Sequence, residues 1–300
     1  MTVAKGLCVI DWEALDPFVV LAALGVTDAT AVTPVHGGQD AAIWRVEHGG
    51  HISALRVFRP DQLRGGRRET QTIRAAIASG LPVPDVRVEG VWNERPAMLL
   101  AWCPGETLLT AIQRQPWRVW MFGALFGRMQ AHIHAATAPE SLRGVPDAWL
   151  DWAGPLDARL RDRLRATATR ADTLLHLDYH PLNVMTNGGH ITGVLDWPNA
   201  RAGDPRADLA RTVVLLHFRP AVSVRPHEAA AVRLLLRAWW YGYQRVAGPV
   251  HDMGPFYALA GAQTVWDQER KVGLPGRAIQ SRDLDPLRRW TAAWMRRIGI

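Results

Sequence analysis

Residues 176–210 read HLDYHPLNVMTNGGHITGVLDWPNARAGDPRADLA and carry most of what this sequence says about fold and function. Three polar residues stand at fixed intervals within them: Asp178, Asn183 five residues later, and Asp196 thirteen residues beyond that. An amide and two carboxylates with this spacing can meet at one site if the chain between them folds back.

The chain between Asn183 and Asp196 has the pattern of a β-hairpin. Residues 184–186 predict one short strand, Asn187-Gly188 a turn, and residues 190–195 the returning strand. Because a hairpin returns on itself, we expect Asp196 beside Asn183.

An amide and a carboxylate side by side, with the Asp178 carboxylate nearby, form a cluster of hard oxygen ligands. Mg²⁺ that bridges nucleotide phosphates takes few protein ligands and prefers oxygen, so the cluster suits this ion. The pattern therefore indicates phosphoryl transfer.

The segment resembles the catalytic segment of the aminoglycoside phosphotransferase and choline kinase family, which are small-molecule kinases with a protein-kinase-like fold. That family has a His-x-Asp-x-x-x-x-Asn loop, a hairpin ending in Asp-Trp or similar, then Gly-Asp-Pro and Asp-Leu-Ala. The matching positions are His176, Asp178, Asn183, Asp196, Trp197, Gly203, Asp204, Pro205, Asp208, Leu209 and Ala210. Weaker resemblance extends to residues 80–84, 99–108 and 121–134.

The resemblance implies a role for each polar residue of the segment. Asp178 would be the catalytic base, or more accurately the group that orients the acceptor hydroxyl, because phosphoryl transfer depends more on positioning than on proton abstraction. Asn183 and Asp196 would hold Mg²⁺. His176 is expected to support the loop structurally, and Asp208 to brace it as a buried carboxylate.

A nucleotide site is expected in the amino-terminal part of the chain. Gly37 and Gly38 lie between two predicted strands, where glycines allow backbone N–H groups to approach phosphate oxygens. Protein kinases hold the α- and β-phosphates with a lysine on the third strand, but no lysine occurs between residues 6 and 270. Arg56 would take that role, with Glu69 as its partner, although a plain surface ion pair is the alternative.

The resemblance places a hinge at residues 98–103, and Leu100 and Trp102 are the positions there expected to face a purine. Since backbone groups would read the base, ATP and GTP are both open as phosphoryl donors. Cys103 is expected to be a packed thiol, and two cysteines are too few for a disulfide framework.

The acceptor would bind in the carboxy-terminal part, which holds ten of the fourteen tryptophans. Aromatic and acidic side chains together can bind a cationic acceptor, and the candidates are Trp240, Trp266, Asp267 and Glu269. The alternative is that tryptophans at helical spacing belong to the core. An aminoglycoside or other amino sugar is the leading acceptor; choline or ethanolamine, homoserine, macrolide and fructosamine acceptors remain open.

The order of elements predicts an α+β, protein-kinase-like, two-lobed fold, with a β-rich nucleotide-binding lobe over residues 1–102 and a helical catalytic and substrate-binding lobe over residues 103–300. Expected strands span residues 31–35, 42–47, 52–58, 85–89 and 97–102. Expected helices span residues 11–24, 61–79, 117–136, 147–169, 205–216, 226–246, 253–271 and 284–298.

Composition narrows the remaining functional classes. The net charge of +7 comes from arginines without a basic stripe interleaved with aromatics, so nucleic-acid binding is not expected. No apolar run reaches the roughly 18 residues of a membrane span, and a cytoplasmic protein without membrane contact is expected. The oligomeric state is left open.

Two other classes stay open beside a small-molecule kinase. A nucleotide-binding pseudokinase would fit the missing third-strand lysine, but it has no need of the complete Asp178, Asn183 and Asp196 set. A protein kinase would carry Asp-Phe-Gly where this chain has Asp196-Trp197-Pro198.

Overall fold

The computed structural model describes residues 15–35, 41–152, 154–218, 226–273 and 279–300. The chain divides into two compact units, which are described separately below. The first runs to Arg74 and resumes over Pro84–Cys103, and the second consists of Ala75–Val83 and Pro104–Ile300.

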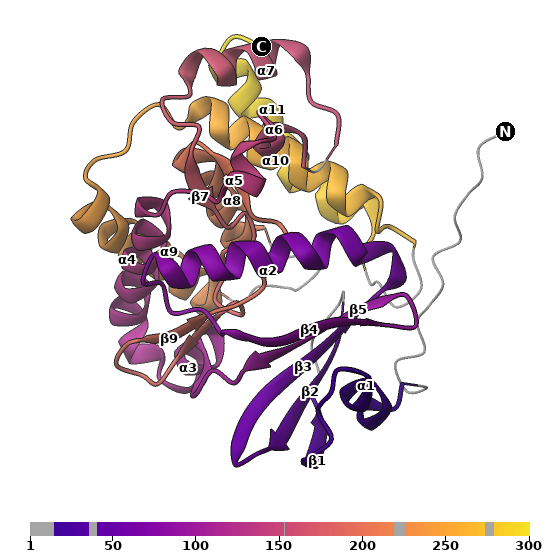
Figure 1. The fold of residues 1–300 in the computed structure, drawn as a ribbon. Coiled ribbons are helices and arrows are strands. Elements are labelled where there is room, and N and C mark those ends of the chain that lie inside the picture. The colour runs from indigo at the N-terminus through magenta and orange to yellow at the C-terminus, as the bar shows by residue number, and fades with distance from the viewer. Residues whose placement is uncertain (1–14, 36–40, 153, 219–225, 274–278) are drawn as a thin grey trace, which may run out of the picture. The chain divides into compact units, whose positions relative to one another are not determined.

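The first unit is built on a five-stranded antiparallel sheet in the order β1-β2-β3-β5-β4 (Figure 1). A short helix contacts β1, and a longer helix follows β3 in the chain and ends in the second unit. The elements are α1 (Pro17–Ala23), β1 (Ala29–Pro34), β2 (Ala41–His48), β3 (His51–Phe58), η2 (Pro60–Gln62), α2 (Leu63–Ala78), β4 (Val86–Trp92) and β5 (Arg95–Ala101).

Alternating apolar residues explain why these segments form a sheet with one buried face. In β2 and β3 the buried positions Trp44, Val46, Leu55 and Val57 alternate with more exposed ones, which is the period of a strand. They pack with residues of α1 in one core cluster. The predicted five-stranded sheet is thus confirmed, with strand ends shifted by at most three residues.

The second unit is mainly helical, with short strands near the predicted catalytic segment. Its strands are β6 (Glu106–Thr107), β7 (Thr173–Leu175), β8 (Val184–Thr186), β9 (Ile191–Val194) and β10 (Arg201–Gly203). Its helices are α3 (Leu108–Arg114), η3 (Pro116–Arg118), α4 (Val119–Ala135), α5 (Glu140–Arg143), α6 (Ala148–Asp151), α7 (Ala158–Thr167), α8 (Pro205–His217), α9 (Pro226–Ala247), α10 (Gly254–Glu269), η4 (Ser281–Leu284) and α11 (Asp285–Arg297). Within the described residues, none of these helices combines the length and apolar character that crossing a bilayer requires.

One predicted helix is wrong. Residues 147–169 form two helices, α6 and α7, because the chain between them leaves the helical path after Trp152. Asp157 then begins α7 by accepting hydrogen bonds from the backbone N–H groups of Arg159 and Leu160. The proline at position 155 marks this break in the sequence.

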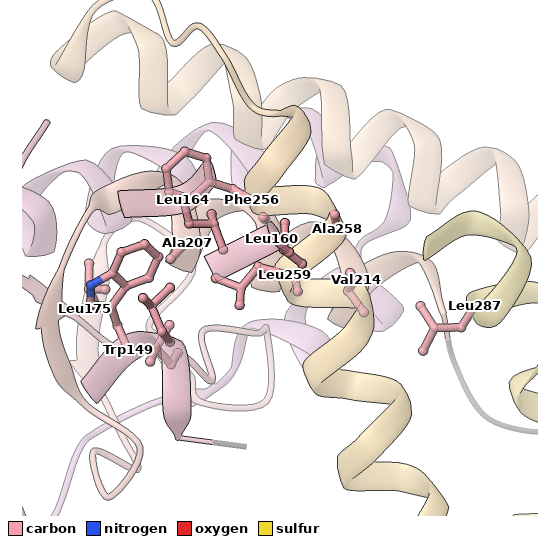
Figure 2. Packing of buried hydrophobic residues seen from close by; sticks show 14 residues of the cluster. Trp149, Leu160, Leu164, Leu175, Ala207, Val214, Phe256, Ala258, Leu259 and Leu287 are labelled. Carbon is pink, nitrogen blue, oxygen red and sulfur yellow. The ribbon is translucent and has the colours of Figure 1, made fainter. Parts of the chain in front are cut away.

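A buried apolar cluster joins residues of α6, α7, β7, α8, α10 and α11 (Figure 2). Trp149 and Phe256 stack with ring centroids 6.0 Å apart, and Leu160 and Leu164 of α7 lie beside them. This cluster packs one face of α8, the helix that carries Asp208, against its neighbours.

Helices α4 and α9 run side by side at unusually close approach (Figure 1). A Cβ added at Gly127 of α4 would lie 1.9 Å from the carbonyl oxygen of Trp239, and one at Gly242 of α9 would lie 2.2 Å from that of Ala124. A Cβ at Gly123 of α4 would also lie 2.6 Å from that of Ala238, so three glycines allow this distance between the helices.

Candidate functional site

The predicted hairpin exists and brings the second half of the catalytic segment back to the first. Strands β8 and β9 pair with Val184 opposite Val194, and the N–H of Leu195 donates to the carbonyl of Asn183 over 2.8 Å. Asp196 therefore follows directly after a residue that is hydrogen-bonded to Asn183. The connection is longer than the predicted Asn187-Gly188 turn, because the register places Thr186 opposite Ile191.

The connection gains its order from side chains. Asn187 Oδ1 accepts from the N–H groups of Gly189 and His190, and Thr186 Oγ1 accepts from the N–H of Gly188. Gly188 adopts a φ of 90°, which favours glycine.

Asn183 is tied directly to Asp178. Its Nδ2 donates to the carbonyl oxygen of Asp178 at 3.0 Å and approaches the carboxylate Oδ2 at 3.4 Å, while its own N–H bonds to the carbonyl of His180 at 2.9 Å. With the amide nitrogen turned toward Asp178, the amide oxygen is the atom available to a metal ion.

His176 links the two halves of the site. Its Nδ1 accepts from the N–H of Asp178 at 3.3 Å, so Nε2 carries the proton and donates to the carbonyl of Leu195 at 2.9 Å. The ring also lies against Trp197, with centroids 4.6 Å apart. His176 is fully buried and contacts backbone on both sides of the site, which is a supporting position.

Asp208 of α8 lies beneath the loop as a fully buried carboxylate. Its oxygens accept from the N–H of Leu177 at 2.6 Å and of His176 at 3.3 Å, and also from Gln130 Nε2 at 3.1 Å and His134 Nε2 at 2.9 Å. Burial acts to raise the pKa of Asp208, but the hydrogen bond and charge of His134 and the bond from Gln130 outweigh it and hold that pKa below its ordinary value.

The backbone at the site is strained at two positions. Leu177 has a φ of 58° and Asp196 a φ of 68°, a region that residues with a Cβ rarely occupy. Leu177 directly precedes Asp178, and Asp196 is itself one of the three polar residues. The fold therefore holds the backbone in an unfavourable conformation at both carboxylates.

Electrostatics indicate that the polar groups form one cluster around His180. Burial lowers the pKa of His180, the charges of Asp178 and Asp196 raise it, and His176 and Arg211 lower it. The His180 ring nitrogen lies 3.8 Å from the Asp178 carboxylate. Because a neutral imidazole does not neutralise the two carboxylates, their negative charge is available to attract a bound cation.

The donor set fits Mg²⁺ held partly by nucleotide phosphates. Within the described ranges, no group of three or more His, Cys, Asp or Glu side chains is placed to hold a metal ion. One amide oxygen and one carboxylate, from Asn183 and Asp196, are the sparse oxygen set that Mg²⁺ takes when phosphates and water supply the rest.

In the first unit, Arg56 and Glu69 pair as predicted from sequence. Arg56 Nη1 of β3 donates to Glu69 Oε1 of α2 at 2.8 Å, and the side chains are 12% and 0% exposed. An ion pair this buried is not a plain surface pair. Leu100 is an interior residue of β5, opposite Ala54 and Val86, and its side chain is buried.

The remaining nucleotide candidates differ in how they are placed. Trp102 follows the end of β5, with its N–H 3.4 Å from the carbonyl of Ile52, and Gly37 and Gly38 fall outside the described residues. Burial raises the pKa of Cys103 to about 11, so this thiol is not a ready nucleophile.

The acceptor candidates lie on two helices with different neighbours. Trp266, Asp267 and Glu269 belong to α10, which packs on α7, α8 and α11, whereas Trp240 belongs to α9, which packs on α4. The acids have basic partners: Asp267 pairs with Lys271 at 2.7 Å, and Glu269 with Arg288 at 2.7 Å. Trp266 packs against Gly154 and under the guanidinium of Arg270.

Sequence reasoning missed two buried residues that contact the loop. Tyr179 donates its hydroxyl to the carbonyl of Phe126 at 2.8 Å and stacks on the Phe126 ring at 4.3 Å. Arg211 of α8 donates to the carbonyl of Leu177 at 3.4 Å. Tyr179 could have been found as an aromatic residue inside a polar loop, but nothing in the sequence distinguishes Arg211 from the many other arginines.

Comparison with known proteins agrees with this geometry. A model of the phosphotransferase enzyme family matches residues 31–248, and no curated protein gives a significant match. Similar solved structures include a thermostable mutant of aminoglycoside phosphotransferase APH(4)-Ia in ternary complex with AMP-PNP and hygromycin B (18% identity, 94% of this chain and 98% of that chain, TM-score 0.62). Another is spectinomycin phosphotransferase APH(9)-Ia with ADP and spectinomycin (14% identity, 94% of this chain and 93% of that chain, TM-score 0.55). A third is macrolide 2'-phosphotransferase MphH from Brachybacterium faecium (20% identity, 92% of this chain and 96% of that chain, TM-score 0.50). At these identities the likeness shows the fold, and the predicted fold class is confirmed.

Proposed function

Because the chain belongs to the phosphotransferase enzyme family, we propose that it transfers the terminal phosphoryl group of Mg·ATP or Mg·GTP to a hydroxyl of a small molecule. The observation that carries this proposal is the bonded set of Asp178, Asn183 and Asp196: Asn183 binds Asp178 directly, and the residue before Asp196 binds Asn183. A phosphoryl-transfer site needs such fixed geometry, because positioning and charge neutralisation supply most of its rate enhancement.

In this proposal each polar residue has one task. Asp178 accepts a hydrogen bond from the acceptor hydroxyl and receives its proton as the new P–O bond forms. Asn183 and Asp196 would hold Mg²⁺, which when bound neutralises charge on the phosphates. Arg56, kept in orientation by the buried Glu69, would grip phosphate oxygens in place of a lysine.

For the acceptor we propose an aminoglycoside or another amino sugar. One of the similar structures is an aminoglycoside phosphotransferase with hygromycin B, and another is a spectinomycin phosphotransferase with spectinomycin. In this chain Asp267 on α10 lies close enough to Arg211 to influence it electrostatically, as Asp178 also does. An acceptor amine near Asp267 would compete with Lys271 for the carboxylate, so an ammonium-bearing ligand has a partner within the same charge cluster.

The test is acceptor-dependent ADP or GDP release over a panel of aminoglycosides, spectinomycin, macrolides, choline and homoserine, with ³¹P NMR to identify the phosphorylated product. The proposal expects a new phosphate ester only with an amino-sugar acceptor, and none with the Asp178→Ala variant. A macrolide or choline ester would keep the reaction and overturn the acceptor class. Absence of both an ester and Mg·AMP-PNP binding would overturn the reaction itself.

The acceptor side can be tested separately with Asp267→Asn. We expect the KM for the amino-sugar acceptor to rise about tenfold while the KM for ATP stays unchanged, since only one charge contact to the acceptor is removed. Asp285→Asn, which also removes one carboxylate from a local ion pair, with Arg288 on α11, is the matched control.

A further inference from the structure

Arg211 stands out because it is a buried charge that no role described above explains. It lies on α8, one turn after Asp208, and is only 5% exposed. Its Nε donates to the carbonyl oxygen of Leu177 at 3.4 Å, while Asp208 Oδ1 accepts from the N–H of the same Leu177 at 2.6 Å. Two side chains of one helix therefore hold both backbone polar groups of a single residue.

That residue directly precedes Asp178 and is strained. Leu177 has a φ of 58°, a backbone conformation that leucine rarely adopts. The conformation persists only where the surroundings fix it, and α8 supplies the two contacts at this point. If the Leu177 peptide groups rotated, the Asp178 side chain would change direction.

Arg211 is itself held in place from the opposite side. Its Nη1 donates to Thr264 Oγ1 of α10, and its guanidinium lies 4.9 Å from the ring centroid of Trp152. Thr264 Oγ1 in turn donates to the carbonyl of Ala260 at 2.6 Å. The guanidinium thus bridges α10 and the loop, with contacts on both sides that fix its position.

The charge environment explains how a buried cation is tolerated. Burial lowers the pKa of Arg211, and the charges of Asp178, Asp267 and Asp208 oppose that effect. A buried ion is costly compared with an apolar residue of similar volume, so stability alone is a poor reason for an arginine here. Its contacts with the loop supply another reason.

We propose that Arg211 is a positioning residue for phosphoryl transfer, which together with Asp208 fixes the Leu177 backbone and thereby the direction of the Asp178 carboxylate. The proposal rests on the proposed function of Asp178, but its structural half, the immobilised Leu177, can be measured without turnover.

The test compares Arg211→Met with Arg206→Met. Arg206 is on the same helix, is 11% exposed, and lies 4.4 Å over the ring of Phe256, but its hydrogen bonds go to Asp204, Thr167 and neighbouring groups away from Leu177. It therefore matches Arg211 in helix and ring contact, is somewhat less buried, and differs in the contact under test.

Two readouts are expected to separate the variants. In Arg211→Met, amide hydrogen exchange in peptides spanning residues 176–180 should speed up at least tenfold, and kcat should fall by roughly 100-fold with the KM for ATP within about twofold of wild type. Arg206→Met should show neither change, even at equal loss of thermal stability. Equal exchange and equal kcat in the two variants would overturn the proposal.

If Arg211→Met does not fold, Arg211→Lys decides the question, because lysine keeps the charge but cannot reproduce the donor pair to Leu177 and Thr264. Faster exchange at residues 176–180 with reduced kcat is expected, and wild-type values for both would overturn the proposal. If wild type shows no turnover with any acceptor, the proposed function fails, while the exchange comparison still decides whether Arg211 immobilises Leu177.

Discussion

At the scale of single residues, the direction of Asp178 depends on groups that hold the backbone around it. His176 accepts from its N–H, Asn183 donates to its carbonyl, and Asp208 holds the preceding residue. A carboxylate placed through three backbone contacts needs no reorganisation when an acceptor hydroxyl arrives, which is the condition under which positioning speeds phosphoryl transfer.

Asp196→Ala should weaken binding of Mg·AMP-PNP by at least tenfold, because it removes the only carboxylate assigned to the metal. The measurement is isothermal titration calorimetry with and without Mg²⁺. Chelation with EDTA should weaken wild-type nucleotide binding by a similar factor, and should change the variant little. An Asp196→Ala protein that binds Mg·AMP-PNP like wild type would disprove the metal assignment.

Asp208 should make stability depend on pH in acid. Its folded pKa lies below the ordinary 3.8, so its contribution is fully present above that value and is lost as pH falls through the folded pKa. We expect Asp208→Asn to cost about 2–4 kcal/mol of unfolding free energy at pH 7, where it leaves buried donors poorly paired. Denaturant titrations of both proteins should converge as pH drops below about 4. A constant difference down to pH 2 would contradict this linkage.

At the scale of elements, the α4–α9 contact is set by glycines rather than by large apolar side chains. Gly127→Ala places a methyl 1.9 Å from a carbonyl oxygen of Trp239, so the helices must separate. We expect a loss of about 1–3 kcal/mol in chemical denaturation. The control is Gly65→Ala in α2, where nothing lies within 4 Å and about 1 kcal/mol of stabilisation is expected. Equal effects of the two substitutions would show that the close approach does not limit the packing.

The same helices show what periodicity can and cannot predict. Long amphipathic segments such as α4 and α9 and the alternating strands β2 and β3 follow directly from the sequence. Two features cannot be predicted from periodicity. The break between α6 and α7 is marked by Pro155 and not by a change of periodicity, and β7 and β10 are strands of three residues each that depend on pairing with one another and, for Thr173, with Thr137.

At the scale of the whole molecule, the fold class could be predicted, and the 176–210 segment sets the relative positions of Asp178, Asn183 and Asp196 by local spacing, while their chemical roles stay predictions. The side-chain contacts that support the 176–183 loop could not be predicted. Gln130 and His134 of α4 bond to Asp208, which in turn holds the loop, and Arg211 of α8 bonds to Leu177 directly, at sequence separations of roughly 30 to 80 residues. Side chains that act through tertiary contact leave no periodic or spacing signal.

The central claim is that Asp178 serves transfer of a phosphoryl group rather than binding of the nucleotide. The most direct measurement is ADP release from Mg·ATP with a productive acceptor, made on wild type and Asp178→Ala together with Mg·AMP-PNP titrations of both. We predict a loss of turnover of roughly 10²–10⁴-fold in the variant, with nucleotide affinity within about threefold of wild type. Turnover retained in Asp178→Ala, or lost only in proportion to weakened nucleotide binding, would contradict the account.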